Sequence, residues 1–400
     1  MPCWPGQGGA TSVQDVLGHV VVVGAGLAGS RAVQELRTQG HTGPVTLLGA
    51  EPHLPYDRPP LSKGLLQGVV DDTTLEGELD ADVRLSTRAT GLRPGTVETS
   101  DGDLAYDGLV LATGAVPRSL GAGMTLRTLD DARALRARLV PGARVVVVGA
   151  GWIGAEVATA AVGAGCATTV VEAGVAPLAL PLGAELGLLT VPWYADAGIE
   201  LRLGCQVASV EADGVELSDG ERLPAEVVVV GIGARPDTGW LEGSGLALDR
   251  GVVVDEHLAA SWEHVVAVGD CAAWWSRRYG ARLRVEHWDD ALHAPTVAVA
   301  TLLGQPAVHA PVPYFWSDQL GHRMQFAGHR DGADHVVRRG EPGSPEGWSA
   351  FWLAGGVLRA ALVVDRPRDF GAARKLLDAG VAPDPALLAD PGVALRSLRT

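Results

Sequence analysis

His-Val-Val-Val-Val-Gly-Ala-Gly-Leu-Ala-Gly, residues 19–29, is the stretch that decides the fold. Its β-branched half predicts a strand that is buried on both faces. Its glycine half opens a helical pattern that ends at Gly40, a residue type suited to the position after a helix. A second apolar run, Val45–Leu48, follows and ends close to Glu51. Together these segments predict one strand–helix–strand unit of the dinucleotide-binding type.

The same design returns at residues 144–154, which read Arg-Val-Val-Val-Val-Gly-Ala-Gly-Trp-Ile-Gly. A helical pattern of small residues follows, and the next predicted strand, Thr168–Val171, ends at Glu172. Each copy is followed later by a strand that ends in a glycine turn, at residues 108–114 and 227–233. The chain is therefore predicted to contain two copies of a dinucleotide-binding fold.

A glycine motif alone is weak evidence, but here each one lies between a buried strand and a helix, with an acidic residue further along. The first glycine makes a tight turn, the second admits a pyrophosphate, and the third packs the helix against the strand. The glycines in these positions are Gly24, Gly26 and Gly29 in the first loop and Gly149, Gly151 and Gly154 in the second. Glu51 and Glu172 would each accept a hydrogen bond from a ribose hydroxyl.

Two such folds in one chain indicate two dinucleotides, one of them a bound redox relay, for which FAD is the obvious candidate. The predicted fold class is α/β, with two interleaved Rossmann-like domains and a smaller C-terminal α+β domain. The first domain, for FAD, is discontinuous and takes residues 1–120 and 243–310. The second, for NAD(P)H, takes residues 121–242, and the C-terminal domain takes residues 311–400.

Composition excludes several function classes. The formal net charge of −15 argues against nucleic-acid binding, which needs a basic surface. The four cysteines form no CxxC pair, so they suit neither a disulfide framework nor a metal centre, and the histidines show no metal spacing. We therefore expect no metal site and no thiol chemistry.

The remaining compositional features concern location. Residues 1–15 contain no basic residue and no apolar run, so we expect a short leader and no signal peptide. No uninterrupted apolar run reaches the roughly 20 residues that a membrane helix needs. A cytoplasmic protein without membrane contact is the expectation.

Several motifs resemble one family more specifically. Tyr-Asp-Arg-Pro-Pro-Leu-Ser-Lys, residues 56–63, is similar to a block of the single-component NAD(P)H:ferredoxin reductases that serve bacterial cytochromes P450 and Rieske oxygenases. These enzymes belong to the glutathione-reductase-like superfamily. Further similar segments occur in the family's order over nearly the whole chain, and they are residues 112–114, 149–156, 231–238, 265–270, 286–288 and 316–319.

The resemblance implies roles for particular residues. Lys63 and Glu156 would form a catalytic pair beside the flavin and the nicotinamide. The other residues that would lie along the FAD are Arg58, Thr113, Gly114, Asp270, His287, Trp288 and Trp316. Each of the less specific assignments has an ordinary alternative: a solvated lysine at Lys63, a helix-surface acid at Glu156, and a core aromatic at Trp316.

The chain departs from the family pattern at one helix. Asp290 stands where the family usually has Asn, and Ala294-Pro295 stands where it has Gln-Gly. Proline lacks the N–H that a helix interior uses, so a kink near the flavin edge is expected.

Three classes of function follow. The first is an FAD-dependent reductase that passes electrons from NADH to a small iron–sulfur ferredoxin serving a monooxygenase or dioxygenase. The second is a reductase or oxidase of a small acceptor, such as a quinone, monodehydroascorbate or a biosynthetic intermediate. Residues 56–68 contain no cysteine, which excludes thiol-dependent relatives. The third is a signalling flavoprotein of the apoptosis-inducing-factor type.

Two finer expectations concern specificity and docking. Glu172 would repel a 2′-phosphate, and no arginine follows it directly, so NADH is expected to be preferred over NADPH. Residues 274–284 contain four arginines and no acid. They would form a basic docking patch for an acidic ferredoxin at Arg277, Arg278, Arg282 and Arg284, the alternative being a solvated loop.

Overall fold

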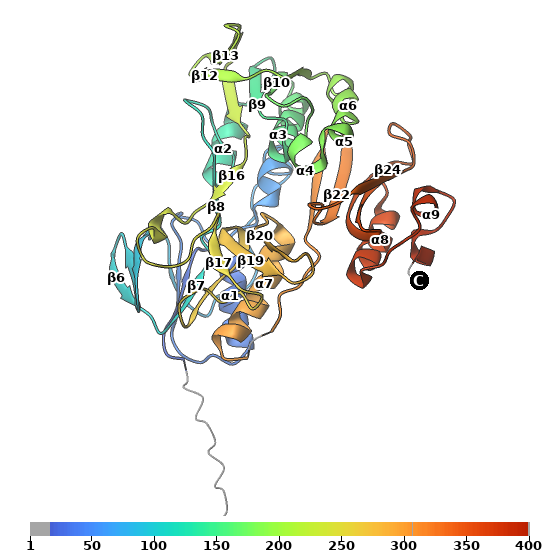
Figure 1. Ribbon diagram of the computed structural model, residues 1–400. Helices are drawn as coiled ribbons and strands as arrows, with labels where there is room; N and C mark the ends of the chain where they lie inside the picture. The colour runs from blue at the N-terminus through green and yellow to red at the C-terminus, as the bar shows by residue number, and fades with distance from the viewer. Residues whose placement is uncertain (1–16, 306, 399–400) are drawn as a thin grey trace, which may run out of the picture.

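The computed structural model describes residues 17–305 and 307–398, so the expected leader at residues 1–15 lies outside the described part. Three units make up this part of the chain (Figure 1). The predicted α/β class and the smaller C-terminal α+β domain are confirmed, and the sheet of that domain is antiparallel.

The first unit is built on a five-stranded parallel sheet with the order β18-β7-β1-β2-β3. Its strands are β1 (Val20–Val23), β2 (Val45–Leu48), β3 (Asp82–Arg84), β7 (Gly108–Leu111) and β18 (Val265–Ala267). Every residue of β1, β2 and β7 is buried, as the uninterrupted apolar runs predicted.

Helices α1 (Leu27–Thr38) and α7 (Trp288–Leu302) pack against each other on this sheet. Helix α7 contains Pro295 and still continues to Leu302, so the proline does not end the helix. The smaller elements of the unit are η1 (Pro59–Ser62), β4 (Ala89–Arg93), β5 (Thr96–Thr99), β6 (Gly102–Ala105), η2 (Gly239–Leu241), β17 (Val252–Val254), η3 (Gly269–Cys271), β19 (Ala272–Ser276) and β20 (Ala281–Leu283).

The second unit repeats the plan with a four-stranded parallel sheet in the order β11-β10-β9-β15. Its strands are β9 (Arg144–Val148), β10 (Ala167–Glu172), β11 (Glu200–Leu203) and β15 (Val227–Val230). Its helices are α2 (Leu129–Arg138), α3 (Trp152–Gly163), α4 (Ala179–Leu182), α5 (Ala184–Leu188) and α6 (Val191–Asp196), and a small antiparallel sheet contains β12 (Val207–Glu211), β13 (Gly214–Leu217) and β14 (Arg222–Pro224).

The chain crosses between these units along a two-stranded antiparallel ribbon. Strand β8 (Ala115–Pro117) leaves the first unit and β16 (Ala234–Pro236) returns to it. Since the first sheet receives β18 only after this return, the first domain is discontinuous in sequence. The domain limits predicted above stay predictions at the level of single residues.

The third unit is a five-stranded antiparallel sheet in the order β21-β22-β25-β24-β23. Its elements are β21 (Tyr314–Gln319), β22 (His322–Gly328), β23 (His335–Arg339), β24 (Trp348–Ala354), β25 (Val357–Val364), α8 (Pro367–Ala379), α9 (Pro385–Ala389) and η4 (Leu395–Leu398). Strand β25 lies at the centre of this sheet, paired with β24, and α8 follows it directly in the chain. The β21–β22 hairpin packs against α3, which joins this unit to the second one (Figure 1).

Candidate functional site

A single large cavity lies where the three units meet. Its volume is about 1580 Å³, which exceeds the roughly 300–1,000 Å³ of a pocket for one small ligand. Both glycine loops line it, and so do residues of the β21–β22 hairpin. The cavity therefore has room for two dinucleotides that meet end to end.

The first glycine loop has the shape that a pyrophosphate needs. Gly24 has a φ of +113°, and a Cβ there would lie 2.2 Å from the carbonyl oxygen of Ala112. A Cβ on Gly29 would lie 1.9 Å from the carbonyl oxygen of Gly24, so helix and strand pack too closely for any side chain. A Cβ on Gly26 would meet no atom within 4 Å, which leaves the backbone open to the cavity.

The second loop repeats this arrangement. Gly149 has a φ of +102°. A Cβ added to Gly154 would lie 2.0 Å from the carbonyl oxygen of Gly149, so no side chain fits there. A Cβ on Gly151 would find its nearest neighbour at 3.8 Å, so this position is open as well. Glu172 accepts from the N–H groups of Ala150 at 2.8 Å and Gly174 at 2.7 Å, which holds its carboxylate at the loop.

Glu51 and Arg58 lie together on the first side of the cavity. Arg58 Nη2 donates to Glu51 Oε1 at 2.7 Å, and the Tyr56 hydroxyl donates to Glu51 Oε2 at 2.5 Å. Thr113 and Gly114 also line the cavity, beside the ribbon that joins the two sheets. The residues predicted to hold the first dinucleotide are thus brought to one wall.

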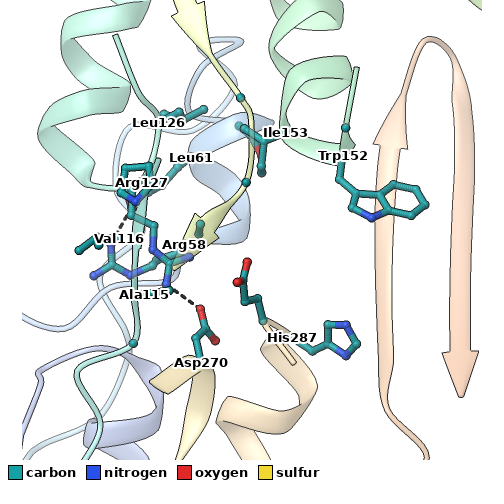
Figure 2. A pocket seen from close by; sticks show the side chains of 18 of the residues that line it. Arg58, Leu61, Ala115, Val116, Leu126, Arg127, Trp152, Ile153, Asp270 and His287 are labelled. Carbon is teal, nitrogen blue, oxygen red and sulfur yellow. Dashed lines mark hydrogen bonds and ion pairs between the residues drawn. The ribbon is translucent and has the colours of Figure 1, made fainter. Parts of the chain in front are cut away.

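Asp270 has a partner that the sequence reasoning missed. The guanidinium of Arg127 contacts Asp270 Oδ2 at 2.7 Å, and both side chains face the cavity (Figure 2). The arginine holds a carboxylate, the group suited to accept from a ribityl hydroxyl, in a largely buried position. Arg127 lies in a loop with no motif of its own, so no local pattern pointed to it.

The start of α7 forms the floor of the cavity. His287 is the residue before the helix, and burial lowers the pKa of its imidazole to about 4, so the ring is neutral near pH 7. Its Nδ1 has no hydrogen-bond partner among the described residues. Trp288 Nε1 donates to Asp57 Oδ1 at 2.6 Å, and burial raises the pKa of that carboxyl. An unpartnered ring nitrogen and the free N–H groups of a helix start suit a polar ring edge such as that of a flavin.

The departure at Asp290 has a structural counterpart. Asp290 Oδ1 lies 3.0 Å from Nε2 of His309, and both side chains are buried. The family's asparagine is therefore replaced here by half of a buried acid–histidine pair.

Glu156 is the point where all three units meet. Its carboxylate is 3% exposed, and Lys63 Nζ donates to Oε2 at 2.7 Å. Ser62 also donates to Oε2, and Ser317 of β21 donates to Oε1 at 2.5 Å. The alternative of a helix-surface acid at Glu156 is wrong, since the side chain is buried and paired. Both serines lie in the family-like segments 56–63 and 316–319, but nothing in those segments indicated that their hydroxyls meet Glu156.

Aromatic side chains close the cavity on the side of the C-terminal unit. Trp152 at the start of α3 and His287 each pack against Phe315, with ring centroids 4.8 Å apart in both pairs. Trp316 points the other way along the strand and contacts Trp288 at 6.0 Å. Trp316 is partly exposed and lines the cavity, so it is not an ordinary core residue.

The predicted four-arginine patch is corrected by the structure. Arg278 donates to the carbonyl oxygen of Leu377 at 2.9 Å, and Arg282 donates to that of Val254 at 2.7 Å. These two guanidinium groups bind backbone carbonyl oxygens of neighbouring segments. They therefore do not form part of a surface patch for a ferredoxin.

The other two arginines differ from each other. Arg284 lines the cavity and pairs with Glu286 at 2.7 Å. Only Arg277 is exposed, and it is paired with Glu256. What remains of the patch is one surface arginine.

Cys166, Cys205 and Cys271 are free thiols, and burial raises the pKa of Cys166 and Cys271. Residues 17–305 and 307–398 contain no group of three or more His, Cys, Asp or Glu side chains placed to hold a metal ion. No helix in these same segments is both long and apolar enough to cross a membrane.

Comparison with known proteins identifies the family. Residues 18–294 match the model of the pyridine nucleotide-disulphide oxidoreductases, and residues 314–399 match that of the reductase C-terminal domain. The ferredoxin reductase component of chlorobenzene dioxygenase from Cupriavidus sp. (strain PS12) is 38% identical over 95% of this chain and 97% of its own.

Two solved structures are similar over the same extent. The crystal structure of Fdr9 has a TM-score of 0.91 and 50% identity, and covers 95% of this chain and 99% of its own. The reductase in the covalent putidaredoxin reductase–putidaredoxin complex also has a TM-score of 0.91, with 32% identity and coverage of 95% and 98%. The chain therefore belongs to the pyridine nucleotide-disulphide oxidoreductase family, and within it to the ferredoxin reductases.

Proposed function

We propose that the protein binds FAD and passes electrons from NADH to a small iron–sulfur ferredoxin that serves an oxygenase. The observation that carries the proposal is the cavity lined by two open glycine loops and by Lys63 paired with the buried Glu156. The relatives support the acceptor class, because one is a dioxygenase component and another was crystallised covalently joined to putidaredoxin.

The residues fit FAD on the first side of the cavity. Gly26 leaves space for a pyrophosphate, Glu51 and Asp270 offer carboxylates to hydroxyl groups, and His287 with the start of α7 faces a polar ring edge. FAD, when bound, accepts a hydride and releases electrons singly, which is chemistry that no side chain supplies.

The side chains of this protein would do the rest. Lys63 places a positive charge in the cavity, where it stabilises negative charge that develops on a reduced ring. Glu156 fixes that ammonium group at 2.7 Å. Gly151 and the start of α3 would hold the phosphates of NADH, while Trp152 and Phe315 exclude water from the junction.

NADH is the proposed reductant in preference to NADPH. Glu172 ends β10 beside the second glycine loop, and its two oxygens are fixed by backbone N–H groups. A carboxylate held in this way accepts from the 2′-hydroxyl of an adenosine and repels a phosphate at the same position.

Docking of the ferredoxin is proposed at the surface around Arg277. Arg277 is the one arginine of the predicted patch that remains at the surface. Trp275 beside it is 39% exposed, and such a pair of an aromatic and an arginine is typical of interface residues.

The test is steady-state NADH oxidation with three acceptors: ferricyanide, a small quinone, and a panel of [2Fe–2S] ferredoxins coupled to cytochrome c. We expect cytochrome c reduction to depend on the added ferredoxin and to saturate with it. A protein that reduces the quinone efficiently and no ferredoxin would instead be a small-molecule reductase. If the protein oxidises no NADH in the presence of any of the three acceptors, it would belong to the non-catalytic class.

A further inference from the structure

The β21–β22 hairpin delivers a loop of the C-terminal unit to the second glycine loop. At the far end of α3, the Leu320 N–H donates to Oγ1 of Thr159 at 2.8 Å. At the near end, Phe315 packs on Trp152, the first residue of α3. Because Phe326 pairs with Phe315 in the hairpin, β22 runs back toward the start of α3. The residues that follow β22 therefore arrive at the helix end that faces the cavity.

Arg330 is the basic residue in this loop. Its Nη2 donates to the carbonyl oxygen of Leu180 at 2.6 Å, and its side chain lines the cavity. Leu180 belongs to α4, which begins just after Leu178, and the Leu178 N–H donates to the carbonyl oxygen of Ala150 at 3.1 Å. Two hydrogen bonds, joined by the first residues of α4, thus connect Arg330 to the glycine loop. Only one donor of the guanidinium is used by Leu180, so others remain for a ligand.

The charge of the cavity wall makes this arginine unusual. Between Gly149 and Trp240 every charged residue that lines the cavity is acidic, namely Glu156, Glu172 and Asp237. On the other side of the cavity Arg58 is paired with Glu51 and Arg127 with Asp270, and Lys63 is already paired with Glu156. The pyrophosphate of a dinucleotide on the second loop would therefore meet a helix start and acidic groups, with no cation from its own domain.

We propose that Arg330 binds the pyrophosphate of the nicotinamide dinucleotide, so that the C-terminal domain supplies a binding residue to the NADH site. The proposal rests on the use of NADH set out above. Guanidinium groups pair strongly with phosphate oxygens, and hydrogen bonds to charged groups are the stronger kind. Asp331, the exposed neighbour, lies 3.5 Å from His329 and does not pair with Arg330 in the described structure.

The experiment uses the FAD-loaded protein and compares Arg330→Gln and Arg330→Lys with Arg338→Gln, an exposed arginine on β23 of the same sheet. Binding of ADP-ribose, which contains the pyrophosphate and no nicotinamide, is measured by calorimetry. Flavin reduction is measured with NADH and with N-benzyl-1,4-dihydronicotinamide, a hydride donor that has no phosphate. Since the readouts involve no ferredoxin, a failure to reduce any ferredoxin would overturn the proposed function and leave this inference standing.

Arg330→Gln should weaken ADP-ribose binding by roughly tenfold or more and raise the KM for NADH, with Arg330→Lys in between. Reduction by the phosphate-free donor and the Arg338→Gln protein should match the unaltered enzyme. Equal ADP-ribose affinity in Arg330→Gln would overturn the proposal, as would an equal loss with both hydride donors, which indicates a purely structural contact with Leu180. A loss seen only with 2′-phospho-ADP-ribose would place the contact at the 2′-position and overturn it too.

Discussion

The hydroxyl of Ser317, in the C-terminal unit, donates to Oε1 of Glu156, in the second unit, at 2.5 Å. The other oxygen of the same carboxylate is held by Lys63 and Ser62 of the first unit. One buried carboxylate thus receives hydrogen bonds from two other domains, and its orientation depends on both.

Ser317→Ala should slow flavin reduction by NADH about tenfold or more, because a hydrogen bond to a buried charge contributes about 1.5–3 kcal/mol. Stopped-flow absorbance of the flavin measures the rate. Ser349→Ala is the matched control, since Ser349 is a buried serine of the same sheet whose hydroxyl has no partner in the described structure. Equal rates in both variants would show that Ser317 does not position Glu156.

Lys63→Met should slow flavin reduction by about an order of magnitude or more, because the cation beside the reacting ring is lost. The sequence contains only one other lysine, Lys375, which is exposed on α8, so Lys375→Met is a direct control. The flavin content of each protein is measured first. An unchanged rate with FAD still bound would remove Lys63 from the mechanism.

The protein should prefer NADH over NADPH by at least about tenfold in kcat/KM, or roughly 1.4 kcal/mol. Glu172→Gln should narrow the preference, because the negative charge that repels a 2′-phosphate is gone while the side chain keeps its shape. Steady-state kinetics with ferricyanide give both ratios. Equal kcat/KM for the two dinucleotides in the unaltered enzyme would contradict the proposed role of Glu172.

Arg277→Glu should raise the KM for ferredoxin and weaken its dependence on ionic strength, since steering between opposite charges is screened by salt. Reduction of ferricyanide should change little. Arg250→Glu makes the same change of charge at another exposed arginine of the FAD-binding domain and should have a smaller effect. Indistinguishable ferredoxin kinetics in the two variants would place the docking surface elsewhere.

His287 should make stability depend on pH below neutrality. Burial lowers its pKa from 6.5 to about 4 in the folded protein, so the unfolded chain takes up a proton first as the pH falls. The stabilising contribution is complete above pH 6.5 and is lost between there and pH 4, by about 3 kcal/mol. His287→Asn should make the free energy of unfolding depend less on pH between pH 6.5 and pH 4. Denaturant titrations at several pH values measure this dependence. An equally steep loss in the variant would assign the effect to other groups.

The fold could be predicted from the sequence because the strand and glycine patterns that specify it are local. A run such as Val20–Val23 can be buried on both faces only in a parallel sheet, and the glycines after it have few other uses. The pairing of Lys63 with Glu156 came from resemblance to a family, since nothing in either local sequence indicates that they meet.

The residues that were missed or misplaced depend on contacts between distant segments. Ser317, Arg127 and Arg330 acquire roles only when domains pack together. The arginine patch failed for the same reason, because charge density along a chain does not show that Arg278 and Arg282 turn toward backbone carbonyls. The expectation of a kink at Pro295 rested on the one N–H that proline lacks. Helix α7 nevertheless continues past Pro295 to Leu302.

The late arrival of β18 beside β7 affects the order in which a growing chain can fold. On the ribosome, β1, β2, β3 and β7 emerge with one edge of their sheet still open, and they stay so while the whole second sheet is synthesised. The second sheet can close as soon as β15 appears, so the domain that begins later in the chain can be the first to finish. The open edge of β7 is an aggregation hazard throughout that interval, until β18 pairs with it.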